Sequence, residues 1–301
     1  MVSGLIILLI ANILGGGLTP LFVKIGTHEI SPVTFTFIRY IIASLVFIPF
    51  FLRVKDKPSK KQVKTICFFS ILFAVNAVFY GLGLQYTSII ASQVLYTLVP
   101  LFVGILAHFI VQEKFTLNKI IGAIISGVGV LVLISGSTDK LQSISLGTPL
   151  GNILVLIAVI SWSFYLVLSR KMSKNEDPAS ISFYSYLMTV AVVAPFVPID
   201  KYISKVDLPH ISPMGYISLA VVGIVSSAFI FYFIQIGVKK TSAYTASVFS
   251  YFAPLFAALT AIPIMHEKVT PQLVVATILI TGGVFIATSL EVIKKKFSSK
   301  L

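Results

Sequence analysis

Charged residues are scarce in this chain of 301 residues. Only 11% of them are Asp, Glu, Lys or Arg, whereas 57% are hydrophobic and the mean hydropathy is +1.00. Soluble domains carry about 25% charged residues, and a soluble core of this length could not bury so much apolar surface. Cysteine is also nearly absent, because Cys67 stands alone, which excludes a disulfide within the chain. These shortages predict an integral membrane protein.

Acidic residues are missing from the centre of every apolar stretch, since all ten lie in connections or within about a turn of a stretch's end. Ion-driven carriers usually hold a buried carboxylate, so this absence favours uniport, exchange or coupling through another group. It also disfavours an intramembrane aspartyl or metal-dependent enzyme. No His-Glu-x-x-His pattern and no complete dinucleotide-binding glycine loop is present, so no motif indicates a metal or a cofactor. A Ser-His-Asp arrangement is not excluded, but nothing specifically indicates one.

Ten apolar stretches are long enough to cross a bilayer, whose hydrocarbon core takes about 20 residues of helix. We therefore predict an all-α integral membrane fold with ten transmembrane helices, joined by connections too short to hold a soluble domain. The predicted spans are residues 4–23, 33–52, 65–84, 90–111, 119–136, 149–169, 181–199, 213–236, 243–264 and 271–292.

The second half of the chain repeats the first. Residues 83–135 align with residues 237–289 at an offset of 154 without a gap, and 16 of the 53 pairs are identical. An offset of 146 relates earlier positions, such as Tyr40 and Tyr186. Each half holds five spans, and because five is odd the second copy should cross the membrane upside down. Inverted repeats place a site at their interface near the bilayer midplane, which is typical of transporters.

Basic residues concentrate in alternate connections. On the side of residues 53–64 lie 17 Lys and Arg residues, five lie on the other side, and Arg39 falls within a span. The positive-inside rule then places both termini, with a basic tail at residues 293–301, in the cytoplasm of a plasma-membrane protein. The net charge of +13 is spread between spans, so a nucleic-acid partner is not expected. The expected partners are the lipid bilayer and a small-molecule substrate, and no motif indicates an oligomeric state.

Polar and aromatic side chains form stripes on the central spans. Spacings of three and four residues place them on one helix face, and unpaired amides and hydroxyls are costly in lipid. They should face inward, where they either bond helix to helix or line a neutral cavity for a small zwitterionic or amphipathic solute. Asn12 and Thr19 could equally be packing residues. The candidate substrate-binding residues are Asn76, Tyr80, Gln93, Tyr96, Trp162, Tyr165, Tyr232, Gln235, Ser247 and Tyr251.

Two prolines lie in the middle of predicted spans, and two ionisable residues, Arg39 and His108, also lie within spans. Pro100 and Pro254 occupy equivalent positions in the two halves, where each removes a backbone hydrogen bond and forms either a bend used in gating or a static kink. Arg39, about seven residues into its span, could hold an anionic group, reach the interface or pair with Glu29. His108, near the inner end of its span, is either a helix-end histidine or a proton relay.

A long motif occurs once in each half. Thr-Ser-x5-Val-x5-Pro-Leu-Phe-x10-Glu-Lys runs from Thr87 to Lys114 and again from Thr241 to Lys268. With the ten spans and the inverted repeat, it resembles the drug/metabolite transporter superfamily in its EamA-type branch. The resemblance implies that spans 1, 3, 4, 6, 8 and 9 surround a central cavity, with spans 5 and 10 at the periphery. It also implies export of amino acids, nucleotides, sugar phosphates or other metabolites. Many members have Trp-Gly where this chain has three glycines at 15–17.

We therefore predict a carrier and not an enzyme. It should move a small organic metabolite, with outward movement of an amino acid or related solute favoured, by alternating access. One EamA-type repeat is expected at residues 1–136 and a second, inverted repeat at residues 149–292. The Glu-Lys pairs at 113–114 and 267–268 are interpreted as helix-end anchors. A flippase for lipid or lipid-linked sugar, which would need a lateral opening between spans, and an intramembrane enzyme are the alternatives.

Overall fold

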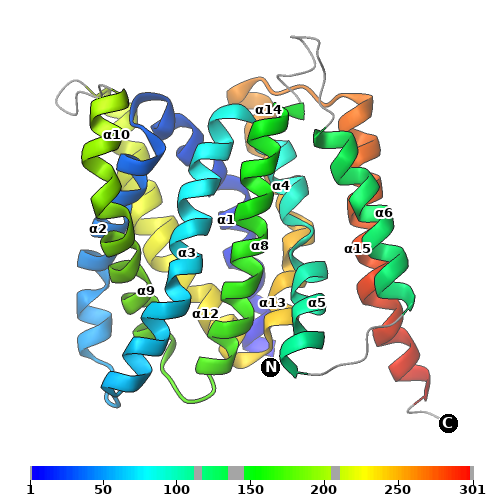
Figure 1. The fold of residues 1–301 in the computed structure, drawn as a ribbon, viewed down its shortest axis with the longest axis horizontal. Coiled ribbons are helices and arrows are strands. Elements are labelled where there is room, and N and C mark those ends of the chain that lie inside the picture. Colours follow the sequence, from blue (N-terminus) through cyan, green and yellow to red (C-terminus); the bar gives the residue numbers. More distant parts are fainter. Residues whose placement is uncertain (1, 112–116, 135–145, 205–210, 299–301) are drawn as a thin grey trace.

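The computed structural model describes residues 2–111, 117–134, 146–204 and 211–298, and every regular element in this part of the chain is a helix (Figure 1). Eight spans are long and apolar enough to cross a membrane, and two shorter apolar helices cover Ile120–Leu133 and Pro271–Ile286. The predicted all-α fold with ten spans is confirmed.

The first half contains α1 (Val2–Glu29), α2 (Pro32–Leu52), α3 (Lys60–Tyr86), α4 (Ile89–Tyr96), α5 (Val99–Val111) and α6 (Leu117–Ile134). The second half contains α8 (Pro149–Met172), α9 (Pro178–Val193), η1 (Ala194–Phe196), α10 (Val197–Ser204), α11 (Pro213–Ala220), η3 (Val221–Ile230), α12 (Phe231–Lys240), α13 (Ala243–Val248), η4 (Phe249–Phe252), α14 (Ala253–Met265) and α15 (Pro271–Ser298). Some spans are therefore built from two or three helical pieces.

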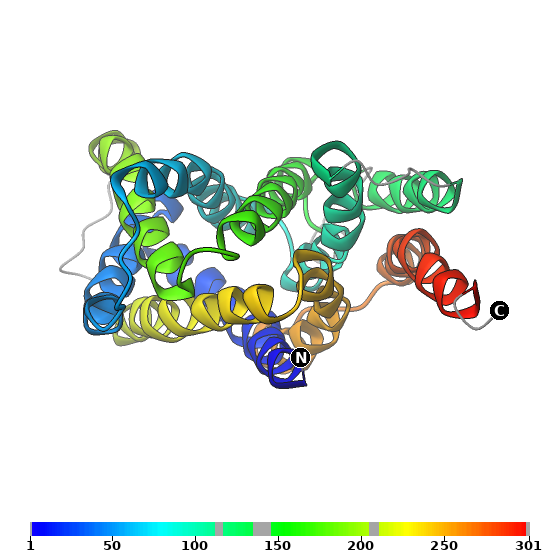
Figure 2. The same ribbon diagram turned by 90° about the horizontal axis from the view of Figure 1, so that it is seen from below.

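The two halves run in opposite directions through the molecule. The Thr148 backbone N–H donates a hydrogen bond of 2.7 Å to the Tyr86 carbonyl, so α8 begins at the face where α3 ends. The helix α1 begins at the opposite face, beside the N-terminus at the bottom of Figure 1. We call the face where α1 ends and α8 begins the upper face, and the opposite face, seen in Figure 2, the lower face.

The repeated Thr-Ser pair is explained by helix capping. Thr87-Ser88 and Thr241-Ser242 join consecutive spans in the two halves. The Ser88 hydroxyl accepts a 3.0 Å hydrogen bond from the Ala91 backbone, and the Ser242 hydroxyl accepts one of 2.9 Å from Thr245. A serine at this position satisfies one of the free N–H groups of the first helical turn, which fixes where α4 and α13 begin.

The repeated prolines restart interrupted helices. Span 4 breaks between α4 and α5, and span 9 passes through the 3₁₀ turn η4 between α13 and α14. Pro100 and Pro254 are each the second residue of the helix that follows. Proline is tolerated there because its missing N–H has no partner in the first turn of a helix. The interruption therefore lies just before each proline, at equivalent places in both halves.

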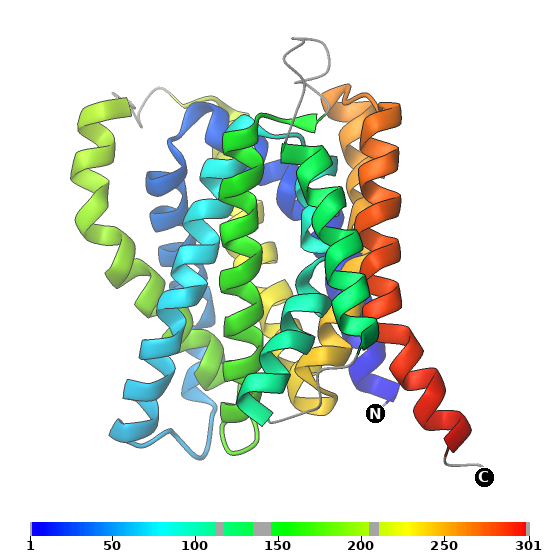
Figure 3. The ribbon, with the colours of Figure 1, turned by 45° about the vertical axis from the view of Figure 1, so that its right-hand side comes forward.

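The helices α6 and α15 form a pair at one side of the molecule (Figures 1, 2 and 3), as the resemblance implies for spans 5 and 10. Small residues allow their backbones to approach closely. A Cβ added at Gly283 would lie 2.7 Å from the Gly122 carbonyl oxygen, and the Ser126 hydroxyl donates to the Ile280 carbonyl at 3.2 Å. Helices associate in this way in lipid, where the hydrophobic drive between them is weak.

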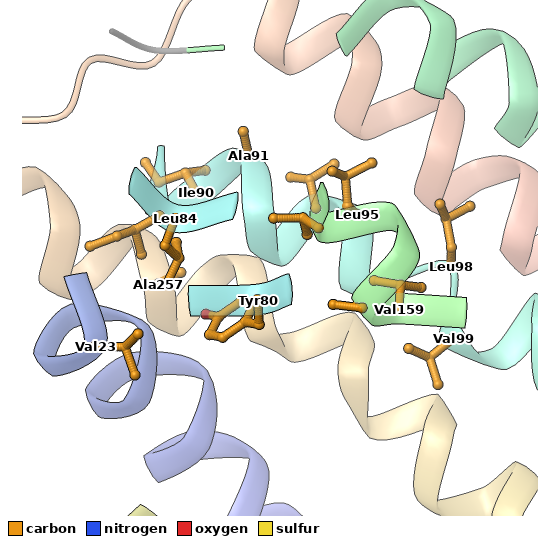
Figure 4. Packing of buried hydrophobic residues seen from close by; sticks show 14 of the residues in the cluster. Val23, Tyr80, Leu84, Ile90, Ala91, Leu95, Leu98, Val99, Val159 and Ala257 are labelled. Carbon is orange, nitrogen blue, oxygen red and sulfur yellow. The ribbon is translucent and has the colours of Figure 1, made fainter. Parts of the chain in front are cut away.

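Buried apolar residues hold the other spans together across the boundary between the halves. Figure 4 shows Val23 of α1 and Tyr80 of α3 near Ala257 of α14. A second cluster is aromatic and joins α2, α3, α8, α9 and α12. In it Phe73 packs against Tyr165 and Phe231, with ring centroids 5.1 and 4.3 Å away. The two clusters flank the middle of the molecule.

The second half is longer than the first between its second and third spans. The repeat offset rises from 146 to 154 between Tyr40 and Gly83, so the second half has eight additional residues there. Span 7 accordingly continues past α9 through η1 and α10, which packs against α2. A carboxylate oxygen of Asp200 in α10 accepts hydrogen bonds from the Ser31 hydroxyl and from the Thr34 backbone N–H, the latter at 3.1 Å. The extension thus contacts the start of the first half's second span.

Candidate substrate-binding cavity

A cavity of about 180 Å³ lies in the middle of the molecule between the two halves. It is smaller than the roughly 300–1,000 Å³ clefts that hold drug-sized ligands, so its size suits a small solute. The lining residues are Ala11, Asn12, Gly15, Gly16 and Thr19 of α1, Arg39 and Tyr40 of α2, Phe73, Asn76 and Tyr80 of α3, Gln93 and Tyr96 of α4, Trp162 of α8, Ser226, Ser227 and Ile230 of η3, Phe231 and Ile234 of α12, Ser250 of η4, and Ala253 of α14.

Half of the predicted substrate-binding residues line this cavity. They come from three helices, α3, α4 and α8, and they are Asn76, Tyr80, Gln93, Tyr96 and Trp162. Their polar groups are held in place by one another. The Asn76 amide donates to the Tyr96 hydroxyl at 2.7 Å and to the Ala158 carbonyl at 2.9 Å, and the Gln93 amide donates to the Tyr80 hydroxyl at 2.8 Å. The first half thus presents a preorganised wall of amide and phenol groups.

Tyr165 and Gln235 lie outside the cavity lining, in a buried polar cluster. The Tyr165 hydroxyl lies 2.9 Å from the Ser185 hydroxyl, which is 2.8 Å from that of Ser70, and the Gln235 amide donates to Tyr165 at 3.3 Å. These contacts join α3, α8, α9 and α12. The alternative interpretation of polar stripes as bonds between helices therefore describes this cluster.

The other three candidates also lie away from the cavity lining. Tyr232 lines a separate hollow of about 510 Å³ at the lower face, together with Phe50 and Arg53. The Ser247 hydroxyl donates to the Tyr244 carbonyl of its own helix at 2.7 Å. Tyr251 packs against the apolar cluster of Figure 4. Of the second-half candidates, only Trp162 lines the cavity, and the other lining residues of this half were not among the predicted ones.

The candidate list omitted several small polar side chains that line the cavity, among them Thr19, which the sequence left open between packing and lining. Thr19 lines the cavity and donates a 2.9 Å hydrogen bond to the Ser226 hydroxyl, which joins the two halves. Ser250 lies 154 positions after Tyr96, so the repeat itself could have identified it. Ser226 and Ser227 gave no comparable signal, because they are isolated hydroxyls in an apolar run.

Gly16 allows α1 and α14 to approach each other closely at the cavity wall. A Cβ at this position would lie 3.0 Å from the Ala253 Cα and 3.3 Å from its carbonyl oxygen, so α1 and α14 meet there through backbone atoms. Gly16 lies 146 positions before Trp162, which is its equivalent in the repeat. The cavity therefore has an indole at only one of two equivalent positions.

Arg39 lines the cavity, and among the described residues it neither reaches the membrane interface nor pairs with Glu29. It is only 4% exposed, so it does not reach the interface, and its Nε has no hydrogen-bond partner among the described residues. Glu29 instead accepts from the Ser212 backbone N–H at 2.7 Å and from the Ser212 hydroxyl at 2.6 Å. The guanidinium lies 4.8 Å from the centre of the Tyr40 ring. The side chain of His108 lies outside the described residues.

Three carboxylates join the halves at the upper face. Glu29 binds Ser212, Asp200 binds the start of α2, and Glu267 binds the start of α4. The Glu267 carboxylate accepts from the backbone N–H groups of Ile89 and Ile90 at 2.6 and 3.1 Å and lies 3.6 Å from the Lys24 ammonium. An acidic group is favourable at a helix N-terminus because of the helix dipole. Glu267 is therefore a helix-end anchor, while Glu113, its counterpart, lies outside the described residues.

Basic residues at equivalent positions of α1 and α8 bind the turns between later spans. Lys24 donates a 2.7 Å hydrogen bond to the Thr87 carbonyl at the upper face. Arg170, which lies 146 positions later, donates to the carbonyls of Val238 and Lys239 at 2.9 and 2.8 Å at the lower face. The described residues thus contain equivalent hydrogen bonds from a basic side chain to a turn at the upper face and at the lower face.

The chain matches known proteins over most of its length. A sequence profile described as "EamA-like transporter family" matches residues 3–135 and 149–289. The "Uncharacterized transporter YoaV" of Bacillus subtilis (strain 168) is 26% identical over 277 residues, covering 90% of this chain and 92% of that protein. The "S-adenosylmethionine uptake transporter" of Rickettsia prowazekii (strain Madrid E) is 26% identical over 271 residues, covering 88% and 84%. A solved crystal structure at 21% identity has the same fold, with a TM-score of 0.66 over 96% of this chain and 99% of that one.

Proposed function

Because the chain belongs to the EamA-like transporter family, we propose that it moves a small amino acid or related metabolite outward through the central cavity by alternating access. The protein is a multi-pass membrane transporter and not an enzyme. The observation that carries the proposal is the position of the cavity, which is lined by side chains of both halves. A site at the interface of inverted repeats can open to either side when one repeat moves against the other.

The lining supports a solute with both polar and apolar parts. Amide and hydroxyl groups of Asn76, Gln93 and Tyr96 stand beside the aromatic rings of Phe73 and Trp162. Such a wall suits an amino acid, whose polar head and side chain need different surroundings. The relative named as an S-adenosylmethionine uptake transporter gives further support, because that compound contains a methionine moiety.

The interruptions before Pro100 and Pro254 supply the proposed bending points. The break in span 4 directly follows the cavity-lining Tyr96 at the end of α4, and the 3₁₀ turn η4 that interrupts span 9 itself contains the cavity-lining Ser250. Broken helices are tolerated inside membranes where the freed backbone groups face protein or a cavity. We infer that the segments on either side of each break change their angle as the cavity opens.

We expect the lower face to be cytoplasmic, because the basic residues concentrate there. In a Cys67→Ser background, cysteines replacing the exposed Lys55 and Tyr202 would report on the lower and upper faces. A membrane-impermeant maleimide applied to intact cells should label Tyr202→Cys only, and Lys55→Cys should require permeabilised cells. Labelling of both positions from outside would contradict the proposed orientation.

We expect Gln93→Ala to weaken solute binding about twofold to tenfold, because one hydrogen bond is worth about 0.5–1.5 kcal/mol. Binding would be measured on purified protein by thermal shift with amino acids and related metabolites, followed by uptake into liposomes. Tyr251→Phe is the matched control, since it also removes a polar group from a broken span but does not line the cavity. Equal loss of binding in both variants, or in neither, would contradict the assignment of the cavity as the substrate site.

A further inference from the structure

The cavity contains a buried positive charge, Arg39, that has no acidic partner within ion-pair distance in the described part of the chain. We propose that the transported solute carries a carboxylate and that Arg39 binds this group, an inference that rests on the proposed carrier function of the cavity. Arg39 is 4% exposed and lines the cavity, and its Nε has no hydrogen-bond partner among the described residues. Burying a charge is costly unless it is paired and hydrogen-bonded. The missing partner is supplied when an anionic solute binds.

Among the described residues, every other side chain that lines the cavity is uncharged. The one ion pair in the described part of the chain joins Lys24 and Glu267 at the upper face, away from this lining. The Tyr40 ring, 4.8 Å from the guanidinium, stabilises the positive charge without neutralising it. The described lining residues therefore carry a formal charge of +1, which favours a solute with a negative group.

The repeat shows that the fold does not need arginine at this place. The equivalent position in the second half, 146 residues later, is Ser185. Its hydroxyl lies 2.8 Å from that of Ser70 and 2.9 Å from that of Tyr165, so a small side chain joins three helices there. Arg39 therefore gives the first half a charged side chain where the second half has the neutral Ser185. This asymmetry favours a role in recognition over a role in packing.

The surroundings of Arg39 suit a carboxylate. A guanidinium presents donors in a planar fork that can bind both oxygens of a carboxylate. The segment η3 packs directly on this part of α2, because a Cβ at Gly223 would lie 3.2 Å from the Arg39 carbonyl oxygen. Ser226 and Ser227 of η3 line the same cavity, and their hydroxyls could donate to a bound anion. No lining carboxylate is present to bind an amine, so carboxylic acids and amino acids should bind better than amines.

The test compares matched probes on purified wild-type protein. The probes are the free amino acids, their carboxamides and the amines that lack the carboxyl group, each titrated by thermal shift. We expect the best-binding acid to exceed its carboxamide in affinity by at least about tenfold, because hydrogen bonds between two charged groups are stronger than those to a neutral amide. Arg39→Gln should reduce this preference to less than about twofold, and Arg39→Lys should retain part of it.

The melting temperature without any ligand provides a second measurement. Since the buried Arg39 Nε has no hydrogen-bond partner among the described residues, Arg39→Gln should fold and melt at or above the wild-type temperature. A lower melting temperature for both Arg39→Gln and Arg39→Lys, with the acid preference kept by the folded fraction, would make Arg39 structural and overturn the proposal.

Other outcomes separate this proposal from the carrier function itself. Equal binding of acid and carboxamide by the wild type, or binding of no acid at all, would overturn the role of Arg39. The cavity would still be the site if Gln93→Ala weakened whichever probe did bind. Binding that neither Arg39→Gln nor Gln93→Ala changes would instead place the substrate site elsewhere and contradict both proposals.

Discussion

Glu267→Ala should weaken the contacts between the halves at the upper face by about 3 kcal/mol, the lower end of the effect expected when one partner of a buried ion pair is removed. The change leaves the N–H groups of Ile89 and Ile90 without their acceptor. It also leaves the Lys24 ammonium, whose side chain is 24% exposed, without its counter-charge. The variant should melt at a lower temperature and should expose the cavity to the upper side more often.

A cysteine in the cavity would measure this opening. In a Cys67→Ser background, Thr19→Cys should react faster with an external impermeant maleimide when Glu267→Ala is added. Lys268→Ala is the control, because this neighbouring side chain is exposed and is not within ion-pair distance of a carboxylate among the described residues. Unchanged labelling and melting in Glu267→Ala would show that this carboxylate does not hold the upper face closed.

Gly16→Ala should reduce transport by about fivefold to 150-fold. The added methyl group would lie 3.0 Å from the Ala253 Cα, so the backbones of α1 and α14 must separate. Overpacking of this kind costs about 1–3 kcal/mol. If it destabilises only one of the two conformations through which the carrier cycles, this free energy corresponds to a change of about fivefold to 150-fold. The initial rate of uptake into liposomes, corrected for the amount of folded protein, measures the effect.

Gly17→Ala is the matched control for Gly16→Ala. The two substitutions are chemically identical and adjacent in α1, but a Cβ at Gly17 would be 3.4 Å from its nearest neighbour, the Phe256 carbonyl oxygen, which is an ordinary contact. Gly17 is also absent from the cavity lining. Transport by Gly17→Ala should stay within about twofold of the wild type. A similar loss in both variants would mean that helix propensity, rather than the approach of α1 to α14, determines the effect.

Local sequence patterns were sufficient to predict the helices and the relation between the halves. Apolar length marked the spans, and the odd number of spans in each half required the inversion. The repeated Thr-Ser pairs coincide with helix starts capped by Ser88 and Ser242. None of these features depends on which spans touch, so they could be inferred from the sequence before the fold was known.

Which residues line the cavity was only partly predictable, in part because spans 8 and 9 are not regular α-helices. Spacings of three and four residues identify one face only while the helix keeps its α-helical period. Span 8 includes the ten-residue π-helical segment η3, and span 9 includes the 3₁₀ turn η4. These segments change the direction in which later side chains point. Ser250 lines the cavity whereas Tyr251 does not, and Gln235, beyond η3, belongs to the Tyr165 cluster.

Contacts between the halves could not be read from the repeat either. Glu267 binds Ile89, which is 178 positions away, and Asp200 binds Thr34, which is 166 positions away. Both carboxylates lie near span ends, where an acidic residue is most simply explained as solvated. Only the folded arrangement shows that each one reaches the start of a helix in the other half.

The extension of span 7 has a consequence for the resting balance of the carrier. If the two halves were identical, the inward-open and outward-open states would be related by exchanging them and would have equal free energy. The additional residues place Asp200 against Ser31 and Thr34 at the upper face alone, so these bonds favour the state that is closed there. A difference of about 1.4 kcal/mol gives a tenfold excess of one state. Without solute on either side of the membrane, we therefore expect the conformation whose cavity opens toward the lower face to be the more populated one.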